Sequence, residues 1–164
     1  MRIRPERPGD ATSIRVVHER AFGQPQEADL VDALRALDGF DPQLSLVAEE
    51  GGDLVGHVLF TALAIDGATA LVLAPLAVDP AHQARGVGSR LVRDGLAVAK
   101  QLGCPAVLVL GHTAYYPRFG FEPAAPHGIR SPFDDAGDSF MVVALGAAPV
   151  PSGWAAFPAP FIAL

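Results

Sequence analysis

The stretch LAVDPAHQARGVGSRL, Leu76–Leu91, joins an apolar run to a helical pattern through a loop that carries two glycines. The run that leads into it, from Ala70, is almost wholly apolar, which predicts a strand buried on both faces, with helices covering both faces of its sheet. After the loop, apolar residues recur at helical spacing until Gly103, and a second apolar run follows at 106–110. A strand, a helix and a strand in this order predict a parallel pair with a right-handed crossover.

Shorter patterns on both sides of this unit complete a mixed sheet. Tight turns at 50–53 and 66–67 predict antiparallel neighbours before the crossover. Asp10 is expected to cap the first helix and Gly39 to close the second. The fold class is therefore α/β or α+β, with a mixed, mostly antiparallel sheet. The expected strands are 1–5, 44–49, 54–65, 70–78, 106–110 and 140–145, and the expected helices run from Asp10 to Phe22, from about Glu27 to Gly39 and from about Val87 to Leu102.

Two segments near the end of the chain contain many prolines. Residues 122–139 are rich in Pro, Gly and Asp, which predicts an exposed loop. The tail, 146–164, holds four prolines but also Trp154, Phe157 and Phe161, so we expect it to pack on the body. We expect a single domain over 1–164, made of a core at 1–145 and a packed tail.

Composition narrows the class of protein. The 164 residues carry a formal net charge of −6, which argues against a nucleic-acid-binding face. The single cysteine, Cys104, cannot form an internal disulfide. No stretch reaches membrane length without a charge, Pro or Gly, and no secretory leader is evident. We expect a soluble, cytoplasmic protein that binds no metal, nucleic acid or membrane.

The glycines of the loop suit phosphate binding. The first N–H groups of a helix lack partners within the helix, and glycine lets an anion approach them closely. Tight helix–strand packing is the alternative reading. A dinucleotide fingerprint would need glycine where Leu91 stands, and a P-loop would need lysine, but the only lysine is Lys100. These motifs therefore give no support to a nucleotide-dependent enzyme, which stays a third possibility.

The pattern Gln83-x-x-Gly86-x-Gly88, at the head of a helix, resembles the acetyl-CoA signature of the GCN5-related N-acetyltransferases. A second landmark of that family, a tyrosine four residues before Gly-Phe, is present as Tyr116 ahead of Gly120-Phe121. The text LAPLAVDP…VLVLGH…YYPRFGF looks like the YhbS-like group of this family. The resemblance implies the family's fold, with a splayed parallel strand pair, and covers 1–145.

The resemblance also implies a cofactor site and a reaction. Acetyl-CoA is the expected co-substrate, and an amine attacks its thioester directly in a ternary complex. Tyr116 is expected to act as general acid toward the leaving thiolate, while Tyr115 is expected to point elsewhere. The alternative for Tyr116 is a half-buried structural aromatic. The residues implied in cofactor binding are Leu76, Ala77, Val78, Gln83, Ala84, Arg85, Gly86, Val87, Gly88 and Ser89.

The general base is not fixed by the sequence. Many family members carry a glutamate on the strand that here reads Leu71–Pro75, and this chain has none there. Glu27, His57 and His112 are the candidates, beside a water or an amine of low pKa. The acceptor is a small amine, a peptide amino terminus or a protein lysine. A non-catalytic acyl-CoA sensor is the alternative function, and a homodimer formed through the tail or an edge strand stays open.

Overall fold

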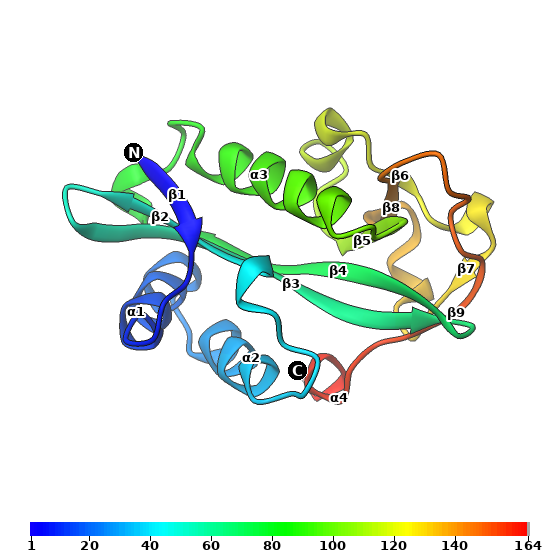
Figure 1. Ribbon diagram of the computed structural model, residues 1–164, viewed down its shortest axis with the longest axis horizontal. Coiled ribbons are helices and arrows are strands. Elements are labelled where there is room, and N and C mark those ends of the chain that lie inside the picture. Colours follow the sequence, from blue (N-terminus) through cyan, green and yellow to red (C-terminus); the bar gives the residue numbers. More distant parts are fainter. Residues whose placement is uncertain (164) are drawn as a thin grey trace.

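The structure of the chain is a computed structural model that describes residues 1–163. The strands of this region form one mixed sheet in the order β1–β2–β3–β4–β5–β8–β6, while β9 pairs with β3 and β7. Helices lie on both faces of the sheet (Figure 1). The strands are β1 (Arg2–Pro5), β2 (Ser45–Glu50), β3 (Asp53–Ile65), β4 (Ala68–Val78), β5 (Ala106–Leu110), β6 (Glu122–Pro123), β7 (Ile129–Arg130), β8 (Phe140–Ala144) and β9 (Gly153–Ala156), and the helices are α1 (Ala11–Phe22), α2 (Gln26–Arg35), α3 (Val87–Gln101) and α4 (Ala159–Ile162).

The expected crossover is confirmed. β4 and β5 are parallel, and α3 connects them. The pairs β1–β2, β2–β3, β3–β4 and β5–β8 are antiparallel. α3 covers one face of the sheet, and α1, α2 and α4 cover the other (Figure 1). Two clusters of buried apolar side chains, one on each face, form the core. The expectation of a mixed, mostly antiparallel sheet with helices on both faces is therefore confirmed.

Local end signals were less accurate than the periodic patterns. Asp10 stands at the N-cap of α1, but its carboxylate bonds Arg4 (2.8 Å) and the Arg7 N–H (2.7 Å) instead of an amide of the helix. α2 ends at Arg35, four residues before the glycine expected to close it. Asp10 is therefore the N-cap residue, as expected, but its carboxylate serves tertiary contacts instead of the helix, whereas the expected end of α2 at Gly39 was wrong.

The expected exposed loop at 122–139 is partly buried. Ala124 and Ile129 are almost fully covered, and the short β6 and β7 lie in this segment. β7 pairs with β9 of the tail, and β9 also pairs with the end of β3. Phe161 of α4 is 6% exposed. A strand pairing between two segments distant in sequence, which composition does not report, explains the burial.

Candidate active site

The parallel strands β4 and β5 separate midway along β4. Their pairing stops at Leu73 and Val109, while β4 continues to Val78 with only β3 beside it in the described structure. Opposite Val58–Phe60, β4 carries one extra residue, and Pro75 has no N–H to offer to a neighbouring strand. Apart from the Val78 carbonyl, which accepts a hydrogen bond from the Gln83 side chain, the outer edge of Leu76–Val78 has no neighbouring strand in the described structure and can pair with an extended ligand.

A cavity of about 440 Å³ adjoins this edge at the head of α3. Its walls are Leu76 and Val78 of β4, all of residues 82–89 except Arg85, and the side chains of Tyr115 and Arg118. From the sequence, Arg85 and Arg90 beside the glycines are the expected sources of added positive charge, but neither lines the cavity. Arg118 takes this place, because the 3-10 turn Tyr116–Phe119 brings it across from the loop. Ala77 does not line the cavity either.

Two residues of the loop that lines this cavity have positive φ angles. Gly86 is the N-cap of α3 in the left-handed region (φ +82°), and Ala84 also has a positive φ of +62°, which is rare for a residue with a side chain. The first helical bond runs from the Arg90 N–H to the Gly86 carbonyl, 3.0 Å. The N–H groups of the first turn before Arg90 thus belong to the unpaired set of a helix start, where the dipole favours an anion.

The alternative role for the glycines, tight packing between helix and strand, falls to another residue. A Cβ at Gly95, in the middle of α3, would overlap the ring of Phe60 on β3. A Cβ at Gly86 would have nothing within 4 Å. At Gly88 it would come 3.4 Å from the Tyr115 hydroxyl, on the side of the cavity. Gly86 is therefore needed for its left-handed backbone conformation. Gly88 leaves free the part of the cavity that a side chain at this position would fill.

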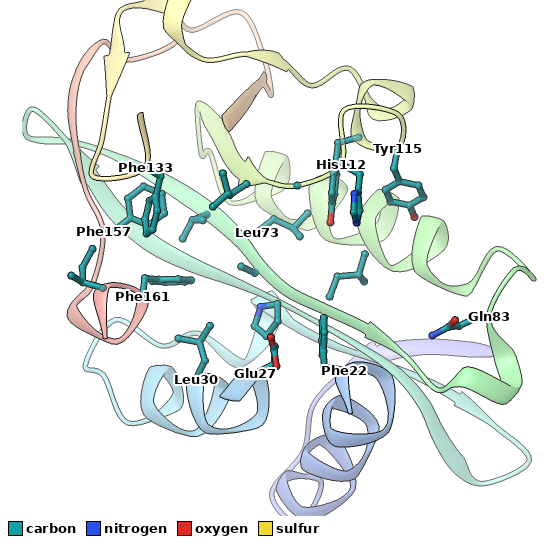
Figure 2. Close-up of a pocket in the computed structure, with 18 residues that line it drawn as sticks. Phe22, Glu27, Leu30, Leu73, Gln83, His112, Tyr115, Phe133, Phe157 and Phe161 are labelled. Atoms are coloured by element: carbon teal, nitrogen blue, oxygen red, sulfur yellow. The ribbon is translucent and has the colours of Figure 1, made fainter. Parts of the chain in front are cut away.

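A second, larger cavity of about 770 Å³ follows the gap between β4 and β5. Figure 2 shows Gln83 and Tyr115 at one end, Phe133, Phe157 and Phe161 at the other, and Glu27 between them. Residues 72–76 of β4, Leu110 at the end of β5, and Gly111 and His112 after it line the cavity along this gap. The two cavities share Leu76, Gln83 and Tyr115, so they form one continuous site.

Tyr116 is held firmly at the wall of the larger cavity. Its side chain is buried, and its ring lies so close to Gly111 that a Cβ there would overlap it. The rings of Tyr115 and Phe121 contact it edge-on, with centroids 5.1 and 5.7 Å away. Burial, aided by the neighbouring Tyr115, raises the pKa of Tyr116 to about 12. The hydroxyl therefore stays protonated at neutral pH.

Tyr115 is a site residue that the sequence reasoning missed. We expected it to point elsewhere, but it lines both cavities, and its hydroxyl lies 3.0 Å from Ser89 Oγ on α3. The Arg118 guanidinium stacks on its ring, 4.4 Å from the centroid. The error came from treating the turn as a helix, in which adjacent side chains diverge. In the actual turn, both tyrosines face the site.

Comparison with known proteins identifies this architecture. The family model of the acetyltransferase (GNAT) family matches residues 12–121, two thirds of the chain. The chain belongs to the GNAT acetyltransferase family. The matched part begins in α1 and ends at Phe121, so it includes the loop at 82–89 and Tyr116. The expected resemblance is thereby confirmed.

Individual GNAT relatives agree with this assignment. The uncharacterized N-acetyltransferase YjhQ of Escherichia coli K12 is 49% identical over 120 residues, covering 71% of this chain and 66% of the relative. The crystal structure of YhbS from Escherichia coli in complex with CoA superposes with a TM-score of 0.91 at 36% identity, covering 98% of this chain and 91% of that one. A GNAT acetyltransferase from Brucella melitensis in complex with acetyl-CoA gives 0.81 at 38% identity, covering 98% and 97%.

The three candidate bases of this GNAT chain lie in different surroundings. Glu27 of α2 and His112 after β5 line the larger cavity. His57 does not: it is fully buried on β3, and its ring nitrogens bond His18 and Ser45, each at 2.8 Å. The structure therefore removes His57 from the site, because the sheet and α1 enclose it on all sides.

His57 instead belongs to a buried polar chain in the GNAT core. The Glu6 carboxylate, paired with Arg35, can only accept, so Ser45 donates its hydroxyl proton to Glu6. His57 Nε2–H then donates to Ser45, and His18 Nε2–H donates to His57 Nδ1. Burial lowers the pKa of His18 to about 4, and burial together with His18 lowers that of His57 well below its usual value.

No group of three or more His, Cys, Asp or Glu in residues 1–163 of this GNAT chain is arranged to hold a metal ion. Over the same range, none of the helices is long and apolar enough to cross a membrane.

Proposed function

We propose that the chain is an N-acetyltransferase that transfers the acetyl group of acetyl-CoA to a primary amine. The observation that carries the proposal is the continuous site, in which an anion-binding helix start, a free strand edge and a buried tyrosine hydroxyl follow one another. Relatives that superpose over almost the whole chain carry CoA or acetyl-CoA.

The residues present fit this co-substrate. Ala84, residues 86–89 and Arg118 line a cavity of about 440 Å³, and the loop amides together with the guanidinium would hold the diphosphate there. The open edge of Leu76–Val78 would hydrogen-bond the amide groups of the pantetheine arm as an added strand would. Gln83 braces this junction by donating from its side-chain amide to the Val78 carbonyl, 3.0 Å.

Acetyl-CoA supplies an activated thioester: the amine nitrogen bonds to the carbonyl carbon, the carbon–sulfur bond breaks, and the thiolate leaves. A backbone N–H near Ala77 or Val78 would stabilise the negative charge that develops on the carbonyl oxygen. Tyr116 gives its proton to the thiolate and is reprotonated from solvent. With a pKa of about 12, the Tyr116 hydroxyl is protonated at neutral pH and is available as a donor.

Glu27 and His112 remain the candidates for removing the amine proton, since both line the cavity. A lysine-like amine has a pKa of about 10.4, so a neutral amine at pH 7 costs about 4–5 kcal/mol. A cationic amine would be attracted to the carboxylate of Glu27. His112 lies farther along the cavity, beside Tyr115, at the end near the phosphate loop (Figure 2).

The test combines binding with turnover. Calorimetric titration with CoA should show saturable binding, and thiol release from acetyl-CoA should depend on an added amine. Tyr116→Phe should lower kcat about a hundredfold or more while CoA still binds, as expected for loss of a general acid. Binding of CoA with no turnover of any amine would favour an acyl-CoA sensor, and absence of CoA binding would refute the proposal.

A further inference from the structure

The half of the larger cavity that lies away from the phosphate loop is strongly aromatic. Three phenylalanines meet there, Phe133, Phe157 and Phe161. The centroid of the Phe157 ring lies 4.8 Å from that of Phe133 and 5.7 Å from that of Phe161. Leu30 of α2 and Ile162 of α4 complete this end, which we call the aromatic end. Figure 2 shows the three phenylalanine rings together, opposite Gln83 and Tyr115.

The larger cavity is lined by few ionisable side chains besides its two tyrosines. Glu27 is its only acidic residue, and neither lysine nor arginine lines it within the described chain. The Glu27 carboxylate accepts hydrogen bonds from the side-chain amide of Gln24, which is exposed, at 3.0 and 3.1 Å. In Figure 2 it lies between the aromatic end and the end at Tyr115. A lone carboxylate among mostly apolar lining residues attracts a cation and repels an anion.

The walls of the aromatic end come from segments distant in sequence. Phe157 and Phe161 belong to the tail, which β9 fastens to β3 and β7. Phe133 stands on the segment that leads to β8, and its ring packs on that of Phe157. The tail thus closes the far end of the cavity, which gives it the concave, apolar form of a small-molecule site.

From these observations we infer that the acceptor is an arylalkylamine: a small primary amine with one positive charge, carried on an aromatic body. This inference rests on the proposed acetyl transfer and names its acceptor class. The aryl group occupies the aromatic end, and the ammonium lies at Glu27, facing the open gap between β4 and β5. The ammonium gives one proton to Glu27 or His112, which both line the cavity, and the neutral nitrogen attacks the thioester carbonyl carbon. The carbon–sulfur bond breaks, the thiolate leaves with the Tyr116 proton, and the second nitrogen proton passes to solvent as the amide forms.

The same features disfavour other amines. An amino acid brings a carboxylate, for which the cavity has no lysine or arginine. A polyamine brings several cations, and only one carboxylate meets them. Peptide groups would lose hydrogen bonds to water against phenylalanine rings, at a cost that apolar contact does not offset.

Matched acceptors test the inference. Phenethylamine and ethylamine differ by the ring, phenethylamine and phenylalanine by the carboxylate, and spermidine represents polyamines. With acetyl-CoA saturating, kcat/KM for phenethylamine should exceed that for ethylamine about ten- to a hundredfold, the range for burying one apolar side chain. Phenylalanine and spermidine should react at least tenfold less well than phenethylamine.

Two variants report on the two ends of the acceptor. Glu27→Gln should raise the KM for phenethylamine about tenfold and leave that for acetyl-CoA unchanged. The matched control is Asp29→Asn on the same helix, whose carboxylate bonds Arg15 (2.7 Å) and does not line the cavity. Phe157→Leu, which keeps the site apolar so that the tail still packs, should reduce the phenethylamine-to-ethylamine ratio several-fold.

The outcomes separate the inference from the proposed function. Transfer to spermidine or phenylalanine in preference to phenethylamine would overturn the inference and leave the acetyltransferase standing. If Phe157→Leu changed selectivity among acetyl-, butyryl- and hexanoyl-CoA but not among amines, the aromatic end would hold the acyl chain, and the inference would also fail. CoA binding without transfer to any of these four amines would overturn the inference, and the proposed acetyl transfer would fail as well only if peptide and protein amines were also left unmodified.

Discussion

Acid should destabilise this protein well above the pH at which its carboxylates titrate. His18 and His57 are fully enclosed, hydrogen-bonded to each other and neutral. Burial is the main reason that the pKa of His18 falls from 6.5 to about 4, and the pKa of His57 is lowered in the same direction. In the unfolded chain both take up protons near pH 6.5. Stability is therefore complete above pH 6.5 and is lost as the pH falls toward 4.

The size of the loss follows from the gap between the two states. pH 5 is about 1.5 units below the pKa of a histidine in the unfolded chain. Protonation of the unfolded chain therefore lowers the free energy of unfolding by about 2 kcal/mol for each histidine that stays neutral when folded. Both together remove about 4 kcal/mol, a large part of the 5–15 kcal/mol typical of a domain. The pKa of Asp10 is lowered from 3.8 by its bond to Arg4, so it remains charged in this range.

Urea denaturation at pH 7.5 and pH 5.0, with a check that the m-value is constant, measures this loss. His18→Gln keeps a donor for His57 Nδ1 and removes one titrating group, so its loss should shrink to about 2 kcal/mol. Equal stability of the original chain at the two pH values would refute the assignment of a neutral buried pair. An undiminished loss in His18→Gln would show that His18 is not responsible.

The other predictions concern the cofactor side of the site. Gly88→Ala should weaken CoA binding in calorimetry with little change in urea stability, whereas Gly95→Ala, which drives a methyl into Phe60, should cost about 1–3 kcal/mol of stability; the reverse pattern would contradict the roles given to these glycines. Arg118→Gln should weaken CoA binding about tenfold and reduce its salt dependence, and unchanged affinity would remove Arg118 from the phosphate site. Tyr115→Phe, which loses the bond to Ser89, should raise the KM for acetyl-CoA two- to tenfold and retain kcat; a loss of kcat instead would make Tyr115 the proton donor.

The regular elements were predictable because their signals are local. The apolar runs of β4 and β5 and the 3.6-residue stripe of α3 follow from backbone geometry and burial, and their bounds agree with the structure within a few residues. Gly86 was recognised as special from its place before a helix, and its positive φ gives the physical reason. The ends of α1 and α2 were harder, since Asp10 is engaged by Arg4 from a neighbouring strand.

The features of the candidate site likewise fall into those that follow from the sequence and those that depend on tertiary contacts. The sequence by itself determined the loop at 82–89 and the tyrosine-to-glycine spacing after β5, because both are consecutive residues whose backbone forms the feature. Only the tertiary structure decided that Arg118 replaces Arg85 at the cavity, that Tyr115 faces the site and that His57 does not. It also decided that the phenylalanines of the tail line the same cavity as Glu27 of α2. These are contacts between segments far apart in the chain, and no periodicity within a single segment records which other segment will pack against it.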